Sequence, residues 1–175
     1  YTRKNIKNDT TLYAKFELID LDLKVYPVLD GKVNETVGTL NLGLGSAVTK
    51  IETTVKWGST VTLKATAKET VSSQYKFEGW YTDLACTKKA DSTTLNNCAY
   101  SSDVIDTKAI KANLTLYANF IDVTPRTVTA KAYYNGAVDA TAGTVKAGPS
   151  AAGATSQTIV TNGKSVTLKA TLSDE

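Results

Sequence analysis

Three stretches of the chain alternate apolar and polar residues with a period of two. Successive side chains of a β-strand point to opposite faces of a sheet, so this period predicts strands with one buried face. Thr, Val and Tyr, which suit a pleated surface, are abundant. The sequence therefore predicts a mainly β fold. The apolar positions of the three stretches are Val61, Leu63 and Ala65; Leu116, Ala118 and Phe120; and Val128, Ala130 and Ala132.

Turn signals stand between the expected strands. The pairs Asp30-Gly31, Asn135-Gly136 and Asn162-Gly163 favour the positive φ angles of tight hairpin turns. Residues 143–155 are rich in Ala and Gly and predict a flexible loop. Residues 103–110 have near-helical apolar spacing, which allows a helix, but a loop or a single short turn fits them better.

Long matches recur along the chain at a nearly constant spacing. Residues 11–16 (TLYAKF) return as residues 115–120 (TLYANF), an offset of 115 − 11 = 104. Residues 58–66 match residues 163–171 at an offset of 163 − 58 = 105. Further colinear matches, such as Gly38 with Gly143, keep the offset of 105. Several colinear matches at one spacing predict a tandem repeat of about 105 residues.

The repeat length predicts where the units begin and end. We expect residues 1–17 to be the C-terminal strand region of a preceding repeat and 18–122 to be one complete repeat. Residues 123–175 are then the N-terminal part of the following repeat. A unit of this size can own a hydrophobic core, so the units should resemble beads on a string, joined by a short linker over 122–126. The chain begins without Met or a signal-peptide pattern, as expected for a window cut from a longer precursor.

The charge pattern argues against two classes of partner. The net charge is +3, and only Arg3 and Arg126 supply guanidinium groups, the preferred ligands of phosphates. Because no basic cluster occurs, we expect no nucleic-acid binding, and the lysines fit solvated strand faces. No apolar stretch approaches the ~20 residues that cross a bilayer, so we expect no membrane insertion.

Two cysteines, Cys86 and Cys98, lie 98 − 86 = 12 residues apart in a polar stretch. A disulfide closing this small loop would suit an oxidising compartment. Two free thiols are the alternative, and a metal pair is a third, although no His is present to complete a metal site. We favour the disulfide.

The sequence offers little chemistry for catalysis. It contains no His, which excludes His-based triads and imidazole acid–base catalysis. A Ser–Lys or paired-carboxylate mechanism remains open, but the acidic residues fall mostly in expected turns and linkers. We therefore predict that the chain is not an enzyme and that it has no catalytic, cofactor-binding or metal-ligating residue. A Lys–Asn or Lys–Asp isopeptide cross-link is a further alternative, which the sequence cannot assign to a pair.

Aromatic residues gather around a glycine in residues 75–83 (YKFEGWYTD). We interpret Phe77, Trp80 and Tyr81 as core residues, with Gly79 at a tight backbone position, because each ring buries on the order of 150–250 Å². The alternative is an aromatic platform that stacks on a sugar. Trp57 lies beside a turn glycine and is the better candidate for an exposed ligand contact.

The aromatic segment, followed about 30 residues later by residues 114–120 (LTLYANF), resembles the Listeria–Bacteroides repeat, the B-repeat of internalin-type surface proteins. The resemblance implies a β-grasp-like or related small β module, strung in tandem on secreted or wall-anchored bacterial proteins, without catalytic residues. The chain departs from that family in its longer period and in the cysteine-bearing loop. The motif and core residues carried over are Phe77, Gly79, Trp80, Tyr81, Leu116, Tyr117 and Phe120.

These observations predict a structural or adhesive module of an extracellular, cell-surface protein, acting as a stalk, spacer or fibre-building unit. Its partners would be neighbouring repeats of the same chain or of like chains. One alternative is a module that binds a glycan or a host surface protein through Trp57. Another is the subunit of a self-assembling filament, in which a strand of one chain completes the next.

Overall fold

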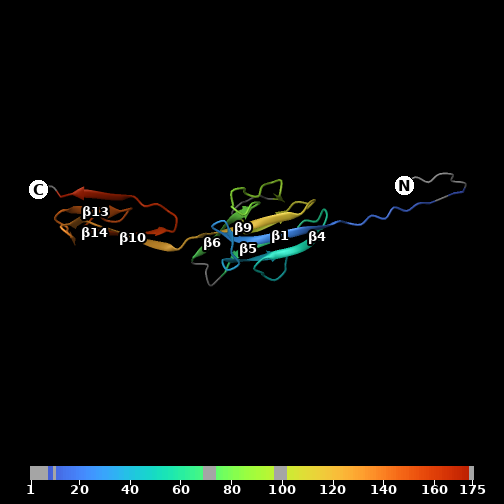
Figure 1. Ribbon diagram of the computed structural model, residues 1–175, viewed down its shortest axis with the longest axis horizontal. Helices are drawn as coiled ribbons and strands as arrows, with labels where there is room; N and C mark the ends of the chain where they lie inside the picture. The colour runs from blue at the N-terminus through green and yellow to red at the C-terminus, as the bar shows by residue number, and fades with distance from the viewer. Residues whose placement is uncertain (1–7, 10, 69–73, 97–101, 174–175) are drawn as a thin grey trace.

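The computed structural model describes residues 8–9, 11–68, 74–96 and 102–173. Fifteen β-strands and no helix occur in these ranges, which confirms the mainly β class. The described residues accordingly contain no helix long and apolar enough to cross a membrane. Two sheets pack together in the middle of the molecule, and three small two-stranded sheets follow towards the C-terminus (Figure 1).

The first sheet of the middle part is built around β1 (Asp20–Leu29). On one edge β1 pairs antiparallel with β4 (Ile51–Lys56) and β2 (Lys32–Val33). On the other edge it pairs parallel with β9 (Leu114–Asp122), whose second edge takes β6 (Tyr75–Tyr81) antiparallel. Strand β9 is therefore held on both edges.

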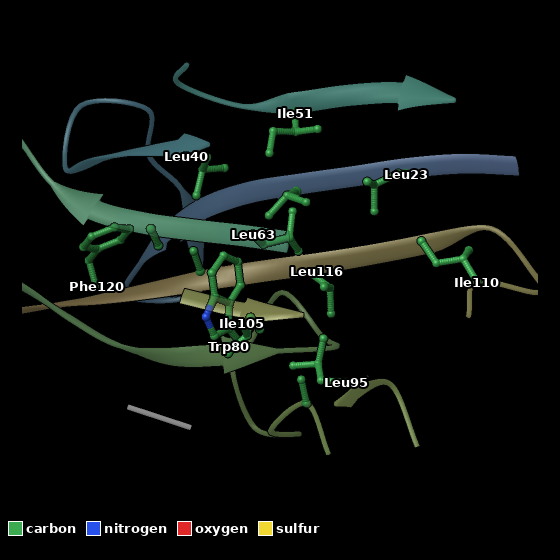
Figure 2. Close-up of a cluster of buried hydrophobic side chains, with 14 of the residues drawn as sticks. Leu23, Leu40, Ile51, Leu63, Trp80, Leu95, Ile105, Ile110, Leu116 and Phe120 are labelled. Carbon is green, nitrogen blue, oxygen red and sulfur yellow. The ribbon is translucent and has the colours of Figure 1, made fainter. Parts of the chain in front are cut away.

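The second sheet has the order β3-β5-β8-β7. Its strands β3 (Gly38–Leu42), β5 (Thr62–Ala67), β8 (Val104–Thr107) and β7 (Leu95–Asn96) pair antiparallel throughout. One cluster of buried side chains fills the space between the two sheets, as Figure 2 shows. Every buried member of this cluster lies between residues 23 and 120. The members labelled in Figure 2 are Leu23, Leu40, Ile51, Leu63, Trp80, Leu95, Ile105, Ile110, Leu116 and Phe120.

Three two-stranded sheets form the C-terminal part. Strand β10 (Pro125–Lys131) pairs with β14 (Thr155–Thr161), β11 (Tyr133–Tyr134) with β12 (Ala137–Val138), and β13 (Gly143–Ala147) with β15 (Leu168–Leu172). Few of its side chains are buried, and several large apolar ones are exposed. The exposed group comprises Tyr133, Tyr134, Val138, Ile159, Leu168 and Leu172.

The strand pairs of the two parts share their registers at a displacement of 105 residues. Each registered pair of β1 with β4, of β1 with β2 and of β3 with β5 has a counterpart in the C-terminal part. One isolated bridge, Leu40↔Val48, follows the same rule. Examples are Asp20↔Lys56 with Pro125↔Thr161, Val28↔Val33 with Tyr133↔Val138, Gly38↔Ala67 with Gly143↔Leu172, and Leu40↔Val48 with Val145↔Gly153.

Two of the three expected hairpin turns are present, whereas Asn162-Gly163 forms a turn after β14 with positive φ at Gly163 only and does not join two paired strands. Asp30-Gly31 joins β1 to β2, and Asn135-Gly136 joins β11 to β12. All four residues have positive φ, between 46° and 83°, as a two-residue hairpin turn requires.

Three local expectations are corrected. Residues 143–155 are not a loop throughout, because β13 occupies their start and pairs with β15. Residues 103–110 hold neither a helix nor a mere turn but β8, which lies between β5 and β7. The linker is shorter than 122–126, since Asp122 ends β9 and Pro125 begins β10, a strand position that tolerates proline.

Candidate functional site

The aromatic segment on β6 lies in the core. The Trp80 side chain is 1% exposed, and its indole N–H donates to the Ser102 carbonyl over 3.1 Å. The Phe77 ring meets the rings of Trp80 and Phe120 edge to face, with centroids 5.5 and 5.7 Å apart. Because Trp80 is buried and Phe77 packs against two rings, the segment presents no open platform for a sugar. Figure 2 shows Trp80 and Phe120 among the core side chains.

Gly79 lies at an irregularity of the β6–β9 ladder. The register shifts between Phe77 and Gly79, so Glu78 forms a β-bulge, and the glycine itself is buried. The Tyr81 hydroxyl donates to the Glu78 carboxylate, and burial raises the pKa of Tyr81, with the hydrogen bond adding to the shift. The bulge at Glu78 therefore lets its carboxylate accept a hydrogen bond from Tyr81, three residues further along the same strand.

Tyr117 lies on the other face of β9 from Leu116. Its ring stacks on Tyr26 of the neighbouring β1, with centroids 6.1 Å apart and an interplanar angle of 29°. The Tyr26 hydroxyl donates to Glu52 over 2.6 Å. This hydrogen bond raises the pKa of Tyr26 and lowers the pKa of Glu52. Lys50 lowers the pKa of Glu52 further.

Phe120 has a partner that the sequence analysis missed. A Cβ atom at Gly38 would lie 2.2 Å from Cζ of the Phe120 ring, which is 1% exposed. Glycine at the start of β3 thus leaves the space in which the phenylalanine ring sits. The recurrence of Gly38 as Gly143 in the repeat was the sequence feature that could have indicated a required glycine here.

Trp57 is the sequence-predicted contact residue that reaches the surface. Its side chain is 45% exposed in the connection between β4 and β5, and its backbone N–H donates to the Ile19 carbonyl. The Lys111 ammonium lies 5.7 Å from the ring centroid, within the range of a cation–π contact. The indole therefore combines an exposed apolar surface with an adjacent positive charge.

Cys86 lies half-buried in the loop after β6. Burial raises its pKa to about 11, and the carboxylates of Asp83 and Glu78 add to the effect. Cys98, its expected partner, lies outside the described residues, so the disulfide stays a prediction. Within the described ranges no group of three or more His, Cys, Asp or Glu side chains is placed to hold a metal ion.

A hollow lies between the small sheets of the C-terminal part. Its volume is about 600 Å³, and residues around β10, β11, β13 and β15 line it. Strand β10 has β14 on one edge, and no described strand pairs with its other edge. The lining includes Ala132, Tyr134, Gly143, Val145, Ala170 and Leu172.

The N-terminal segment, defined here as residues 11–19, exposes large apolar side chains. All of its residues are exposed and none belongs to a strand. The Tyr13 and Phe16 side chains are 92% and 90% exposed, and Leu12 is also largely exposed. Residues 11–16 of this segment match residues 115–120, which belong to β9 in the middle part.

Comparison of the chain with protein-family models, curated proteins and solved structures finds no match. The function is therefore inferred from the sequence and the geometry of this chain.

Proposed function

We propose that the chain is part of a tandem-repeat structural protein of the bacterial cell surface, in which each repeat of about 105 residues serves as a stalk, spacer or fibre-building unit. The observation that carries this proposal is the common displacement of 105 residues between the strand registers of the middle and C-terminal parts. The proposed boundaries are residues 1–17, 18–122 and 123–175.

Shared register is a demanding criterion. A slip of one residue turns every side chain of a strand to the other face, so register is fixed by burial and turn geometry together. Irregular hydrogen bonds also agree at the same displacement: Leu40 N–H donates to Val48 as Val145 N–H donates to Gly153. Trp57 N–H likewise donates to Ile19, and the Asn162 N–H to Thr124. Local agreement of this kind supports one module occurring twice.

The acidic side chains support a structural role. Asp91 accepts hydrogen bonds from the backbone and hydroxyl of Thr93, and Asp139 accepts the same pair from Thr141. These hydrogen bonds, first those from the threonine hydroxyls, lower the pKa of both carboxylates. Carboxylates used in this way fix turns, which is what a mechanically stable module requires.

The fold and the location are proposed on different grounds. The parallel β1–β9 pair inside an otherwise antiparallel sheet supports a β-grasp-like or related module. Membership of the Listeria–Bacteroides repeat family, and with it an extracellular, wall-associated location, rests on the aromatic segment and the Thr-Leu-Tyr-Ala strand. A disulfide between Cys86 and Cys98 would agree with that location.

The test is the length of longer arrays. One, two or three extra copies of residues 18–122 are inserted after residue 122, and small-angle X-ray scattering measures the maximum dimension. A spacer adds the same increment for each copy while the thermal unfolding temperature stays constant. Increments that shrink with each copy, or arrays that collapse to a compact shape, would refute the proposal.

A second candidate function is binding of a glycan or a host surface protein through Trp57. The half-exposed indole beside Lys111 favours it, because such a surface suits stacking against a sugar. A glycan array and a pull-down with host surface proteins, each with the wild type and Trp57→Ala, test it. Binding that is lost in the variant supports this function, whereas no binding, or binding that survives the substitution, contradicts it.

A further inference from the structure

Strands β1 and β9 are the first and the last strand of the middle part, and they are direct neighbours. They pair in parallel over seven registered residues, from Leu23↔Leu114 to Leu29↔Phe120. The chain enters this pair at the start of β1, beside the start of β9, and leaves it at the end of β9. The points of entry and exit therefore lie at opposite ends of one parallel strand pair.

A pull on the two sides of the middle part acts along these strands. In Figure 1, β1 and β9 extend along the long axis of the molecule, and the N-terminal segment and the C-terminal part leave the middle part at opposite ends. Tension between these ends slides β1 against β9, so it loads the evenly spaced hydrogen bonds of the parallel ladder together. A pull across the strands would instead break the same hydrogen bonds one after another.

The β1–β9 pair lies inside the sheet rather than at its edge. Strand β4 covers the other edge of β1, and β6 covers the other edge of β9. On the core face Leu23, Val25 and Leu116 are fully buried. On the outer face the Tyr26 ring stacks on Tyr117. Side chains thus shield the ladder from water on both faces, which strengthens its hydrogen bonds.

The proline in β1 does not interrupt this ladder. The Pro27 carbonyl accepts a hydrogen bond over 2.9 Å from the N–H of Asn34, directly after β2, on the edge of β1 that faces away from β9. The nitrogen and the carbonyl of one strand residue point to the same edge, so the N–H that proline lacks also faces away from β9. In addition, the Asp22 N–H donates to the side-chain oxygen of Asn113 over 2.9 Å. The pair therefore gains a hydrogen bond at the end where the chain enters.

We propose that β1 and β9 form a clamp that keeps the middle part folded under tension, so that the chain transmits force along its length without extending. The clamp follows from the topology of the middle part and does not require the tandem repeat. It gives a mechanical role to the proposed spacer, and that role rests on the proposed function.

The first test measures the lifetime of the full chain at constant force in magnetic tweezers, with handles at the two chain ends. Cys86→Ser and Cys98→Ser remove the predicted disulfide, which would shorten the unfolding step. Unfolding of the middle part releases 122 − 20 + 1 = 103 residues, a step of at most about 350 Å. The C-terminal part releases 172 − 125 + 1 = 48 residues, so the step size separates the two events.

The direction of the pull provides the control. Lys32→Cys places a handle at an exposed residue that pairs with Leu29, which is itself registered with Phe120. With the other handle at the C-terminal end of the chain, force enters and leaves at the same end of the clamp. The lifetime of the middle part at the same force should shorten about 100-fold or more, because three hydrogen bonds that no longer break together contribute about fivefold each.

The second test is a matched pair of asparagines. Asn113 and Asn41 each make one side chain–backbone hydrogen bond of 2.9 Å at the surface, but only Asn113 joins the clamp. With handles at the chain ends, Asn113→Ala should speed unfolding about fivefold, and Asn41→Ala about twofold or less. The Asn113 effect should disappear when the chain is pulled from Lys32, because its hydrogen bond then lies at the far end of the clamp.

Equal lifetimes in the two pulling directions would overturn the inference, and so would equal effects of the two asparagine substitutions. Urea unfolding of each variant verifies that it folds, and the asparagine pair tests the clamp even if the Lys32 variant does not. The array measurement proposed above depends on spacing between repeats and not on force. It therefore separates failure of the clamp from failure of the proposed function.

Discussion

Truncation of Trp80 tests the position of the aromatic segment in the core. The indole lies 1% exposed between the two sheets of the middle part. It packs edge to face against Phe77 and donates its N–H to the Ser102 carbonyl. Alanine at this position removes both contacts and leaves a cavity the size of an indole ring.

The expected loss is large compared with the stability of a domain of this size. Phe or Trp to Ala substitutions in cores cost about 3–5 kcal/mol, because the lost transfer free energy is added to the cost of the cavity. For a unit of about 100 residues each kcal/mol lowers the melting temperature by about 4–8 °C. A loss of about 4 kcal/mol therefore predicts a melting temperature lower by about 15–30 °C.

Urea and thermal unfolding followed by far-UV circular dichroism measure this loss without depending on tryptophan fluorescence. Trp57→Ala is the matched control, since the same residue type is 45% exposed there, and it should cost less than about 1 kcal/mol. The reasoning would be refuted if Trp80→Ala stayed within about 1 kcal/mol of the wild type, or if both substitutions cost the same.

Three further predictions concern Gly38, the two cysteines and Tyr26. Gly38→Ala should destabilise the middle part by about 1–3 kcal/mol in urea unfolding, because its Cβ meets a buried ring, and an unchanged midpoint would contradict this. If Cys86 and Cys98 form the predicted disulfide, reduction should raise the intact mass by two hydrogens, whereas an unchanged mass contradicts the pairing. The hydrogen bond from Tyr26 lowers the pKa of Glu52, so the ionised carboxylate stabilises the fold above its ordinary pKa, and this stabilisation is lost as the pH falls. Tyr26→Phe should therefore reduce the drop in the urea midpoint between pH 7 and pH 3. An equal drop in the variant and the wild type would exclude this coupling.

The period-two pattern predicted the β-strands where apolar residues define one face. It succeeded for residues 62–67 and 114–122 because Leu63, Leu116 and Phe120 mark that face without ambiguity. The hairpin turns at Asp30-Gly31 and Asn135-Gly136 were predictable for a similar reason, since Asp-Gly and Asn-Gly adopt positive φ at low cost.

The missed strands show where the pattern is insufficient. In β8 the buried face consists of Ile105 and Thr107, and a threonine is not counted as apolar. Thr107 can be buried because its hydroxyl accepts a hydrogen bond from the Val61 backbone N–H over 2.9 Å. Strand β13 lacks large apolar residues, so its composition does not indicate a strand. It forms a strand because it pairs with β15.

Part of the candidate site was beyond sequence reasoning for a different reason. Pairing of β1 with β9 joins Leu23 to Leu114, 114 − 23 = 91 residues away, and no local pattern specifies such a partner. The fit of the Phe120 ring against Gly38 depends on that pairing.

Repetition of one module is the central claim, and interstrand nuclear Overhauser effects in solution test it most directly. Tandem repetition predicts that each contact between β1 and β4 has a counterpart between β10 and β14 at residue numbers higher by 105, as for Asp22–Thr54 and Thr127–Ile159. A β10–β14 ladder shifted by even one residue from this correspondence, or no such ladder, would contradict it.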